Sequence, residues 1–167
     1  IEAQQDAKGI SINKAITTPL TETTPEAITS LLAQIMNQNS IRPDKLIGLI
    51  SRKDVTVRLL KLPSTDAQEL QQMVSFEAVK QIPFPAEDIF FDYRIMEATS
   101  DGYSHVLLSI AHKNIVNKFM DILGKNNLKP DILTLTAEGL YLWAKANFAE
   151  DIKAKKSILV IDIDANK

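Results

Sequence analysis

Five short blocks follow one another in residues 57–93: VRLLKLP (57–63), EL (69–70), FEA (76–78), QIPFP (81–85) and FDY (91–93). The first block belongs to an alternating run that is typical of a strand, and Pro63 ends it. Ser64-Thr65-Asp66 supplies helix N-caps, so a helix is predicted from there to about Gln81. The prolines of the fourth block end that helix, and the alternation from Ile89 to Met96 predicts a second strand.

The predicted helix carries more apolar residues than one narrow stripe needs. They are Leu70, Met73, Val74, Phe76, Ala78, Val79 and Ile82. A helix with so wide an apolar surface is expected to contact two neighbours rather than one.

Downstream of the second strand, the pattern continues to alternate between strands and helices. Asp101-Gly102 is a hairpin signal, and Val106, Leu108 and Ile110 predict the returning strand. An amphipathic helix is predicted over 113–125, followed by a short strand over 131–135 and a helix from about Ala137. The remaining segments are a charged linker over 150–156 and a strand over 157–164.

Upstream, strands at 1–5 and 10–16 are predicted to form a hairpin through Gly9. Thr24-Pro25-Glu26 starts a helix with a hydroxyl cap, a proline at the first helical position and an acid in the first turn. The apolar run 46–50 is typical of a strand buried on both faces. Together these elements predict a mixed α/β fold with antiparallel hairpins, in which 53–130 is an insert between host flanks.

Composition excludes several classes of function. The 167 residues are 45% hydrophobic and carry a formal charge of −2, without the basic excess of a protein that binds nucleic acid through phosphates. The absence of cysteine excludes disulfides and thiolate zinc sites. No apolar run reaches the roughly 20 residues that span a membrane. Because the chain begins at Ile1 and closes on a strand that has just started, we expect it to be a piece of a longer protein.

The usual catalytic and phosphate-binding motifs are also missing. The sequence contains no G-x-x-x-x-G-K-[ST] loop, no G-x-G-x-x-G turn and no G-x-S-x-G elbow. His105 and His112 are seven residues apart, which predicts boundary histidines rather than a metal site of three or four converging ligands. No residue is therefore predicted to be catalytic, and no metal site is predicted.

The sequence alone leaves two interpretations open for each of three features: an aspartate pair, an arginine and a phenylalanine. Asp162 and Asp164 lie on one face of the last strand, where they either hold a metal–nucleotide complex or merely end a strand in solvent. Arg58 either pairs with a carboxylate or belongs to the solvated face of an edge strand; the candidate carboxylates are Glu69, Glu77 and Asp92. Phe84, between two prolines, either covers the core beneath the helix or offers an aromatic anchor to a partner.

The five blocks, in this order and spacing, resemble the PilM family of type IV pilus assembly proteins. That family typically shows an Arg before a Leu-Pro, then a Glu-Leu, a Glu-Ala, an Ile-Pro-Phe-Pro and an Asp-Tyr. The resemblance extends beyond the blocks to 107–111, 128–130, 136–140 and 158–165. It covers most of the first lobe of such a protein.

The resemblance implies an actin-like, ribonuclease H-like fold similar to that of the cell-division protein FtsA. Residues 1–52 and 131–156 then correspond to part of subdomain 1A, and 53–130 to the inserted subdomain 1C, which is SHS2-like. Residues 157–167 correspond to the first strand of the second lobe.

The same resemblance implies a cytoplasmic scaffold at the inner face of the inner membrane. PilM binds the short cytoplasmic N-terminus of the bitopic membrane protein PilN in a groove between the two subdomains. On this basis the residues expected to bind the partner are Arg58, Phe76, Val79, Phe84 and Tyr93. The chain would reach the membrane only through that partner.

Two departures from the family pattern concern nucleotide. The first phosphate loop is missing, and the second reads Asp162-Ile163-Asp164-Ala165, with Asp in place of the glycine that approaches phosphate. We therefore expect no cofactor and no enzymatic activity in this chain, and an ATP and Mg²⁺ site is left open for the full-length protein alone. Three alternatives stay open: an actin-like ATPase in the full-length protein, a scaffold like GspL of type II secretion, and self-association into filaments.

Overall fold

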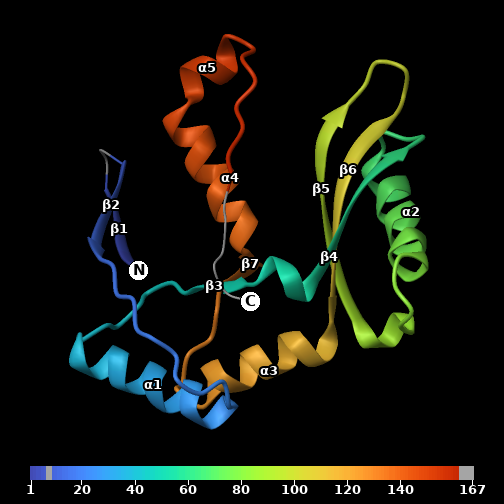
Figure 1. Cartoon of the computed structure of the whole chain (residues 1–167). Helices are drawn as coiled ribbons and strands as arrows, with labels where there is room; N and C mark the ends of the chain where they lie inside the picture. The colour runs from blue at the N-terminus through green and yellow to red at the C-terminus, as the bar shows by residue number, and fades with distance from the viewer. Residues whose placement is uncertain (7–8, 162–167) are drawn as a thin grey trace.

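The computed structural model describes residues 1–6 and 9–161 and is a mixed α/β structure (Figure 1). Its strands are β1 (Glu2–Asp6), β2 (Gly9–Lys14), β3 (Ile47–Ile50), β4 (Val55–Leu62), β5 (Ile89–Ala98), β6 (Ser104–His112) and β7 (Ile132–Leu135). Its helices are α1 (Pro25–Gln38), α2 (Ala67–Lys80), α3 (Lys113–Gly124), α4 (Thr136–Asn147) and α5 (Ala149–Lys153). Within the described residues, β1 pairs with β2, β3 pairs in parallel with β7, and β4, β6 and β5 form an antiparallel sheet in that order.

Helix α2 packs on one face of the three-stranded sheet. Asp66 is its N-cap, and its Oδ1 accepts hydrogen bonds from the backbone N–H groups of Gln68 and Glu69 at 2.9 and 3.0 Å. Leu70, Val74 and Ala78, spaced by four, are fully buried on one side of the helix. They share a core with Leu62, Ile89, Val106, Leu108 and Ile110.

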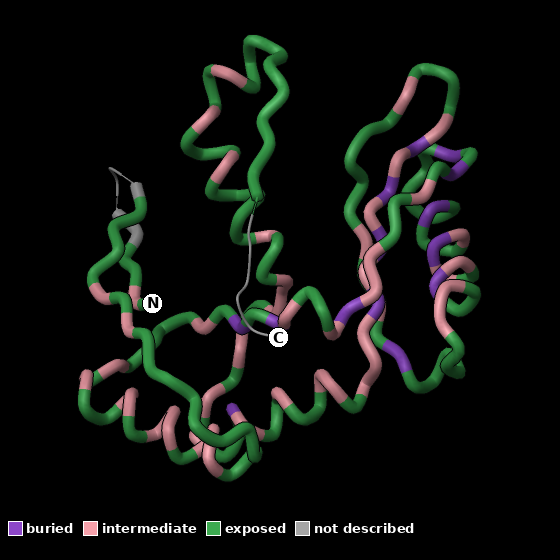
Figure 2. The backbone as a smooth tube through the Cα atoms, viewed as in Figure 1, coloured by how far each residue is buried: buried purple, intermediate pink, exposed green. Residues whose placement is uncertain are grey.

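This core is the main concentration of buried residues, as Figure 2 shows along β6 and α2. The prediction that α2 contacts two surfaces differs from what the structure shows. Its second apolar side faces outward, with Phe76 71% exposed and Val79 half-exposed. The reason is that no other element of the described chain covers that side, so the extra apolar width has no neighbour here.

The parallel strands β3 and β7 lie beside α3. Asp131 and Leu46 are joined by two hydrogen bonds at the start of this strand pair. The Oδ2 of Asp131 accepts from the Leu46 N–H at 2.8 Å, and the Asp131 N–H donates to the Leu46 carbonyl at 2.8 Å. The prediction that β3 is buried on both faces was wrong, since Ile47 and Leu49 are 59% and 49% exposed. A pair of strands with α3 on one face leaves the other face open.

Gly48 is the place where this part of the molecule is most tightly packed. A Cβ there would lie 2.7 Å from Phe119 Cε1 and 2.9 Å from Leu133 Cδ1. We expect Gly48→Ala to lower the free energy of unfolding by about 1–3 kcal/mol, the usual cost of overpacking a core. Urea unfolding monitored by circular dichroism measures it.

Gly139 provides the matched control for that substitution. It lies in α4, and a Cβ there would meet nothing within 4 Å. Gly139→Ala should therefore raise stability, by roughly 0.5–1 kcal/mol from helix propensity. If both alanines shift the urea midpoint in the same direction, the close approach at Gly48 is not what determines the result.

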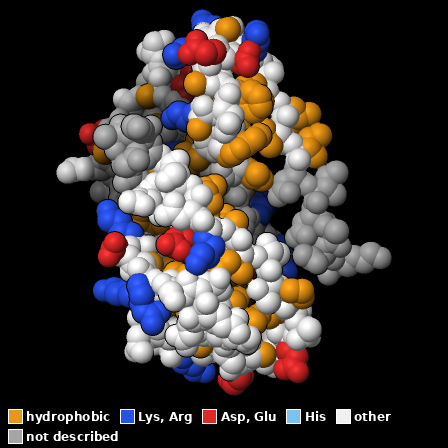
Figure 3. Space-filling model, turned by 90° about the vertical axis from the view of Figure 1, so that its left-hand side faces the viewer, with side chains coloured by type: hydrophobic (Ala, Val, Ile, Leu, Met, Phe, Trp, Pro, Cys, Tyr) orange, Lys and Arg blue, Asp and Glu red, His pale blue; other side chains and the backbone are white. Residues whose placement is uncertain are grey.

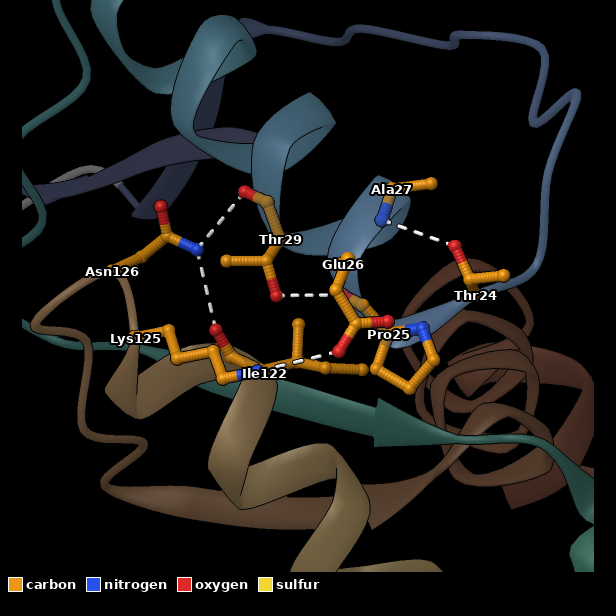
Figure 4. Close-up of polar contacts among 8 residues, drawn as sticks. All are labelled: Thr24, Pro25, Glu26, Ala27, Thr29, Ile122, Lys125 and Asn126. Carbon is orange, nitrogen blue, oxygen red and sulfur yellow. Dashed lines mark hydrogen bonds and ion pairs between the residues drawn. The ribbon is translucent and has the colours of Figure 1, made fainter.

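Helices α1 and α3 lie against each other, and polar contacts join the start of α1 to the end of α3 (Figure 4). Asn126 Nδ2 donates to the carbonyls of Thr29 and Ile122 at 3.1 and 3.2 Å, and Lys125 Nζ lies 3.7 Å from Glu26 Oε1. The side chain of α1's cap, Thr24, accepts from the Ala27 N–H at 3.3 Å. Helix α3 thus follows directly on β6 but packs with α1.

The predicted division of the chain, with an insert over 53–130, stays a prediction. The strands β4 to β6 share their core with α2, whereas α3 contacts α1, the side of β3 and the end of β6. The segment 150–156, predicted as a linker, contains the short helix α5. For 157–161 the structure shows no strand, because no neighbouring strand pairs with it in the described residues; 162–164 lie outside them.

The β5–β6 hairpin closes through the predicted Asp101-Gly102 turn, with Gly102 at φ 83°. The Thr99 hydroxyl donates to Asp101, which lowers the pKa of that carboxyl from its ordinary value. The contribution of this bond to stability is present above the carboxyl's unfolded-state pKa and is lost as pH falls through the lower folded-state value. The effect is small because Asp101 is exposed.

Within residues 1–6 and 9–161, no helix combines the length and apolar character that crossing a bilayer requires.

Candidate functional site

A groove of about 400 Å³ lies between the face of the three-stranded sheet that α2 leaves free and the β7–α4 junction. Its volume lies in the range of ligand sites. Most of its lining is apolar, and it includes Ile50, Val55, Phe90, Leu107, Ala111, Val116, Leu133 and Leu135. The polar and charged lining comes from Asp92, Arg94, Ser109, Thr134 and Glu138.

Strand alternation directs two different sets of β5 side chains to the two faces of the sheet. Phe91 and Tyr93 lie opposite Ile110 and Leu108 and pack against the α2 core. The intervening residues, Phe90, Asp92 and Arg94, lie opposite Ala111, Ser109 and Leu107 on the groove side. Phe91 and Tyr93 also line the groove although their side chains pack with α2, so the free edge of β5 is part of its wall.

An ion pair joins the two walls of the groove. Arg94 Nη1 of β5 lies 2.5 Å from Glu138 Oε1 of α4, and the Arg94 guanidinium also lies over the Tyr141 ring, 5.9 Å from its centroid. The Glu138 side chain is only 18% exposed. Its Oε1 is buried, and its contact is the ion pair with Arg94.

A second cation lies at the other end of the groove-facing stretch of β5, which runs from Phe90 to Arg94. Lys113 Nζ, at the start of α3, lies 5.3 Å from the centre of the Phe90 ring. Between these two ends lies Asp92, whose Oδ1 accepts only the N–H of the next residue, Tyr93, at 2.8 Å. Asp92 has no cation within ion-pair distance among the described residues.

The structure does not bring the five predicted partner-binding residues together. Tyr93 lines the groove. Phe76 and Val79 lie on the outer side of α2, and Arg58 lies on β4, opposite Leu108 and so on the α2 face of the sheet. As partner contacts all five stay predictions.

Phe84 lies in a second hollow, at the junction of the sheet with α3. Its ring meets His112 edge to face, with centroids 4.6 Å apart. His112 in turn caps α3, because its Nδ1 accepts the Asn114 N–H at 3.1 Å. Phe84 therefore covers the β6–α3 junction while remaining half-exposed.

Of the two interpretations of Arg58, the structure favours the solvated position on an edge strand, because Arg58 is exposed on β4 and pairs with no carboxylate. Arg58 Nε donates to Gln81 Oε1 at 3.3 Å. Glu69 accepts from the Ser64 hydroxyl at 2.6 Å, Glu77 pairs with Lys80 at 2.7 Å, and Asp92 faces away on the groove side. Gln81 ends α2 close to the edge of β4, which gives the guanidinium a neutral acceptor nearer than any acid.

Sequence reasoning missed Phe90, Arg94, Leu107 and Glu138 as groove residues. One signal was present in the alternation of β5, whose supposedly polar face carries Phe90 and Met96 as well as charges. A strand face that mixes large apolar and charged side chains is typical of a contact surface rather than a solvated one. Glu138 had no such signal, because only the fold brings it to β5.

The structure gives no geometry for a nucleotide site. Asp162 and Asp164 lie outside the described residues. In the described part of the chain, no three His, Asp or Glu residues gather in a way that could hold a metal ion.

Exposed apolar side chains also occur on α4. Leu140, Tyr141, Leu142 and Trp143 are all exposed there, and Figure 3 shows hydrophobic side chains gathered on the upper part of that side of the molecule. Four successive residues point in different directions round a helix, so these side chains do not form a single face, and Tyr141 lies on the groove side beside Arg94.

Known proteins are similar to this chain in sequence or in fold. A solved structure described as the PilM-PilN type IV pilus biogenesis complex matches with a TM-score of 0.68 and 22% identity, over 80% of this chain and 43% of that one. The type II secretion system protein L of Xanthomonas campestris pv. campestris is 28% identical over 101 residues, which are 56% of this chain and 27% of that protein. The cytoplasmic domain of EpsL of Vibrio cholerae matches with a TM-score of 0.47 and 14% identity, over 66% and 42% of the two chains.

The chain thus spans less than half the length of these relatives. The likeness to the PilM-PilN structure confirms the predicted mixed α/β, actin-like fold class. A sequence model of the family described as type IV pilus assembly protein PilM matches residues 2–167, almost every position. The chain belongs to the PilM family.

Proposed function

We propose that this chain is the part of a type IV pilus assembly scaffold that binds the short cytoplasmic N-terminal peptide of a PilN-like inner-membrane protein. The peptide lies in the groove between β5 and the β7–α4 junction. The observation that carries the proposal is the groove itself, because an apolar floor beside a free strand edge suits an extended peptide.

Two comparisons support the choice of partner. The family model matches the chain almost throughout, and the similar solved structure is a complex of PilM with PilN. The scaffold would then lie in the cytoplasm at the inner face of the inner membrane, held there by its partner rather than by a span of its own.

Calorimetric titration with a synthetic N-terminal peptide of the PilN-like protein encoded beside this chain tests the proposal. We expect saturable binding near micromolar, worth about −8 kcal/mol. A scrambled peptide of the same composition is the control. Absence of heat with this chain and with the full-length protein, at peptide concentrations well above micromolar, would contradict the proposal.

A second candidate function is a scaffold of type II secretion, which the 28% identity to a type II secretion protein L favours. The pilus and secretion roles differ in their cellular consequence. Deleting the gene should remove surface pili if the first proposal holds, and should retain secreted proteins inside the cell if the second holds. Electron microscopy and assay of the culture supernatant separate the two.

We further propose that binding needs neither catalysis nor nucleotide. The residues that line the groove do not include Asp162 and Asp164, on which the ATPase alternative depends. Adding ATP and Mg²⁺ to this chain should leave both its melting temperature and its affinity for the peptide unchanged. A rise in melting temperature with ATP would favour the ATPase alternative.

A further inference from the structure

The charges along the groove indicate what kind of peptide it selects; the inference rests on the proposed function. Three charged side chains line the groove: Asp92, Arg94 and Glu138. Arg94 and Glu138 neutralise each other across it at 2.5 Å. Asp92 is left as a carboxylate without a cationic partner among the described residues, in a groove whose remaining floor is mostly apolar.

Asp92 is exposed on the groove side of the edge strand β5. It lies opposite Ser109 on β6, the middle strand, with Phe90 and Arg94 two residues away on either side and on the same face. Arg94 is already engaged by Glu138 and by the Tyr141 ring. A docked chain would therefore meet an exposed negative charge on the edge strand, beside the apolar floor of the groove.

The free edge of β5 sets the conformation of the occupant. In the described chain β5 pairs only with β6, so its other edge leaves backbone N–H and C=O groups unpaired along the groove. A segment added beside this edge would be extended, and every second side chain would point the same way. Its inward residues would meet the Phe90, Asp92 and Arg94 positions in turn.

We propose that Asp92 is a specificity-determining residue, which selects an extended peptide carrying Lys or Arg flanked by apolar residues at alternate positions. Apolar neighbours on the peptide cover Phe90 and the floor at Leu107, and this covering removes water from the ion pair. Desolvation strengthens the pair relative to one on an open surface. An acidic residue at the same peptide position would be repelled.

The test is a double-mutant cycle measured by calorimetry, with the N-terminal peptide of the PilN-like protein as probe. One series replaces each Lys or Arg of the peptide by Gln, and the other replaces Asp92→Asn in the chain. Asn preserves the acceptor for the Tyr93 N–H, so the strand is undisturbed. We expect Asp92→Asn to raise Kd about tenfold, or roughly 1.4 kcal/mol.

One of the peptides in which Lys or Arg is replaced by Gln should raise Kd for the unaltered chain by the same factor. With the Asp92→Asn chain, that peptide should raise Kd no further. The matched control is Glu97→Gln, which removes the same charge from β5 at a position outside the groove and should leave Kd unchanged. If the unaltered chain binds the unaltered peptide but Asp92→Asn binds it equally well, the inference fails while the proposed function stands. If the unaltered chain and peptide do not bind at all, the proposed function fails first.

Discussion

Leu107→Glu is expected to weaken binding of the partner peptide at least a hundredfold, which is about 2.7 kcal/mol. Leu107 lies on the central strand β6 and forms part of the apolar floor of the groove. A carboxylate placed there would lie directly opposite Arg94, whose guanidinium Glu138 already engages. The peptide would cover this second carboxylate, and burying a charge that has no partner of its own costs several kcal/mol. Calorimetric titration of the variant with the N-terminal PilN-like peptide measures the loss.

Leu59→Glu is the matched control, because Leu59 pairs directly with Leu107 in register and shares its sheet face. Leu59 is 65% exposed and does not line the groove. Its substitution should change Kd less than threefold, since an exposed position needs no desolvation on binding. Equal losses for the two variants would mean that the whole sheet face binds, and no loss for Leu107→Glu would place the peptide elsewhere. Circular dichroism melts of both variants confirm that they remain folded.

The secondary structure of the chain could be predicted closely because its local signals are strong. The cap at Asp66, the proline after α2 and the Asp101-Gly102 turn each fix an element boundary through backbone chemistry that no distant contact alters. The errors occur where burial depends on whether another element of the fold covers a given face. Strand β3 reads as doubly buried from its apolar run, yet its outer face has no cover in the described chain.

The candidate site was harder to predict because it depends on which face of each element finds a neighbour. Phe76 and Val79 form an apolar pair on α2 that looks like a binding surface in the sequence, but they lie on the opposite side of the sheet from the groove. Arg94 and Glu138 are 44 residues apart, and nothing in either neighbourhood indicates that they meet. Local periodicity gives the faces of an element, whereas only the tertiary arrangement says which face meets another element.

The largest effect on stability is expected from Leu108→Ala. Leu108 is the neighbour of Leu107 on β6, but its side chain is fully buried and faces α2. Removing three carbon atoms from this site loses apolar burial and leaves a cavity between the sheet and the helix. Comparable Leu→Ala substitutions in cores cost about 2–5 kcal/mol. Since small domains are stable by only about 5–15 kcal/mol, urea unfolding should show a large fall in the midpoint.

Leu107→Ala tests whether burial, rather than the strand itself, causes that loss. Both substitutions remove the same atoms from adjacent positions of β6, so strand propensity and unfolded-state effects are alike. Leu107 is only partly buried, and its truncation should cost about 1 kcal/mol or less, the scale for removing partly exposed apolar surface. A Leu107→Ala loss as large as that of Leu108→Ala would show that the groove face is also packed in the free protein. The groove would then be closed before any peptide arrives, and binding would require the two walls to separate first.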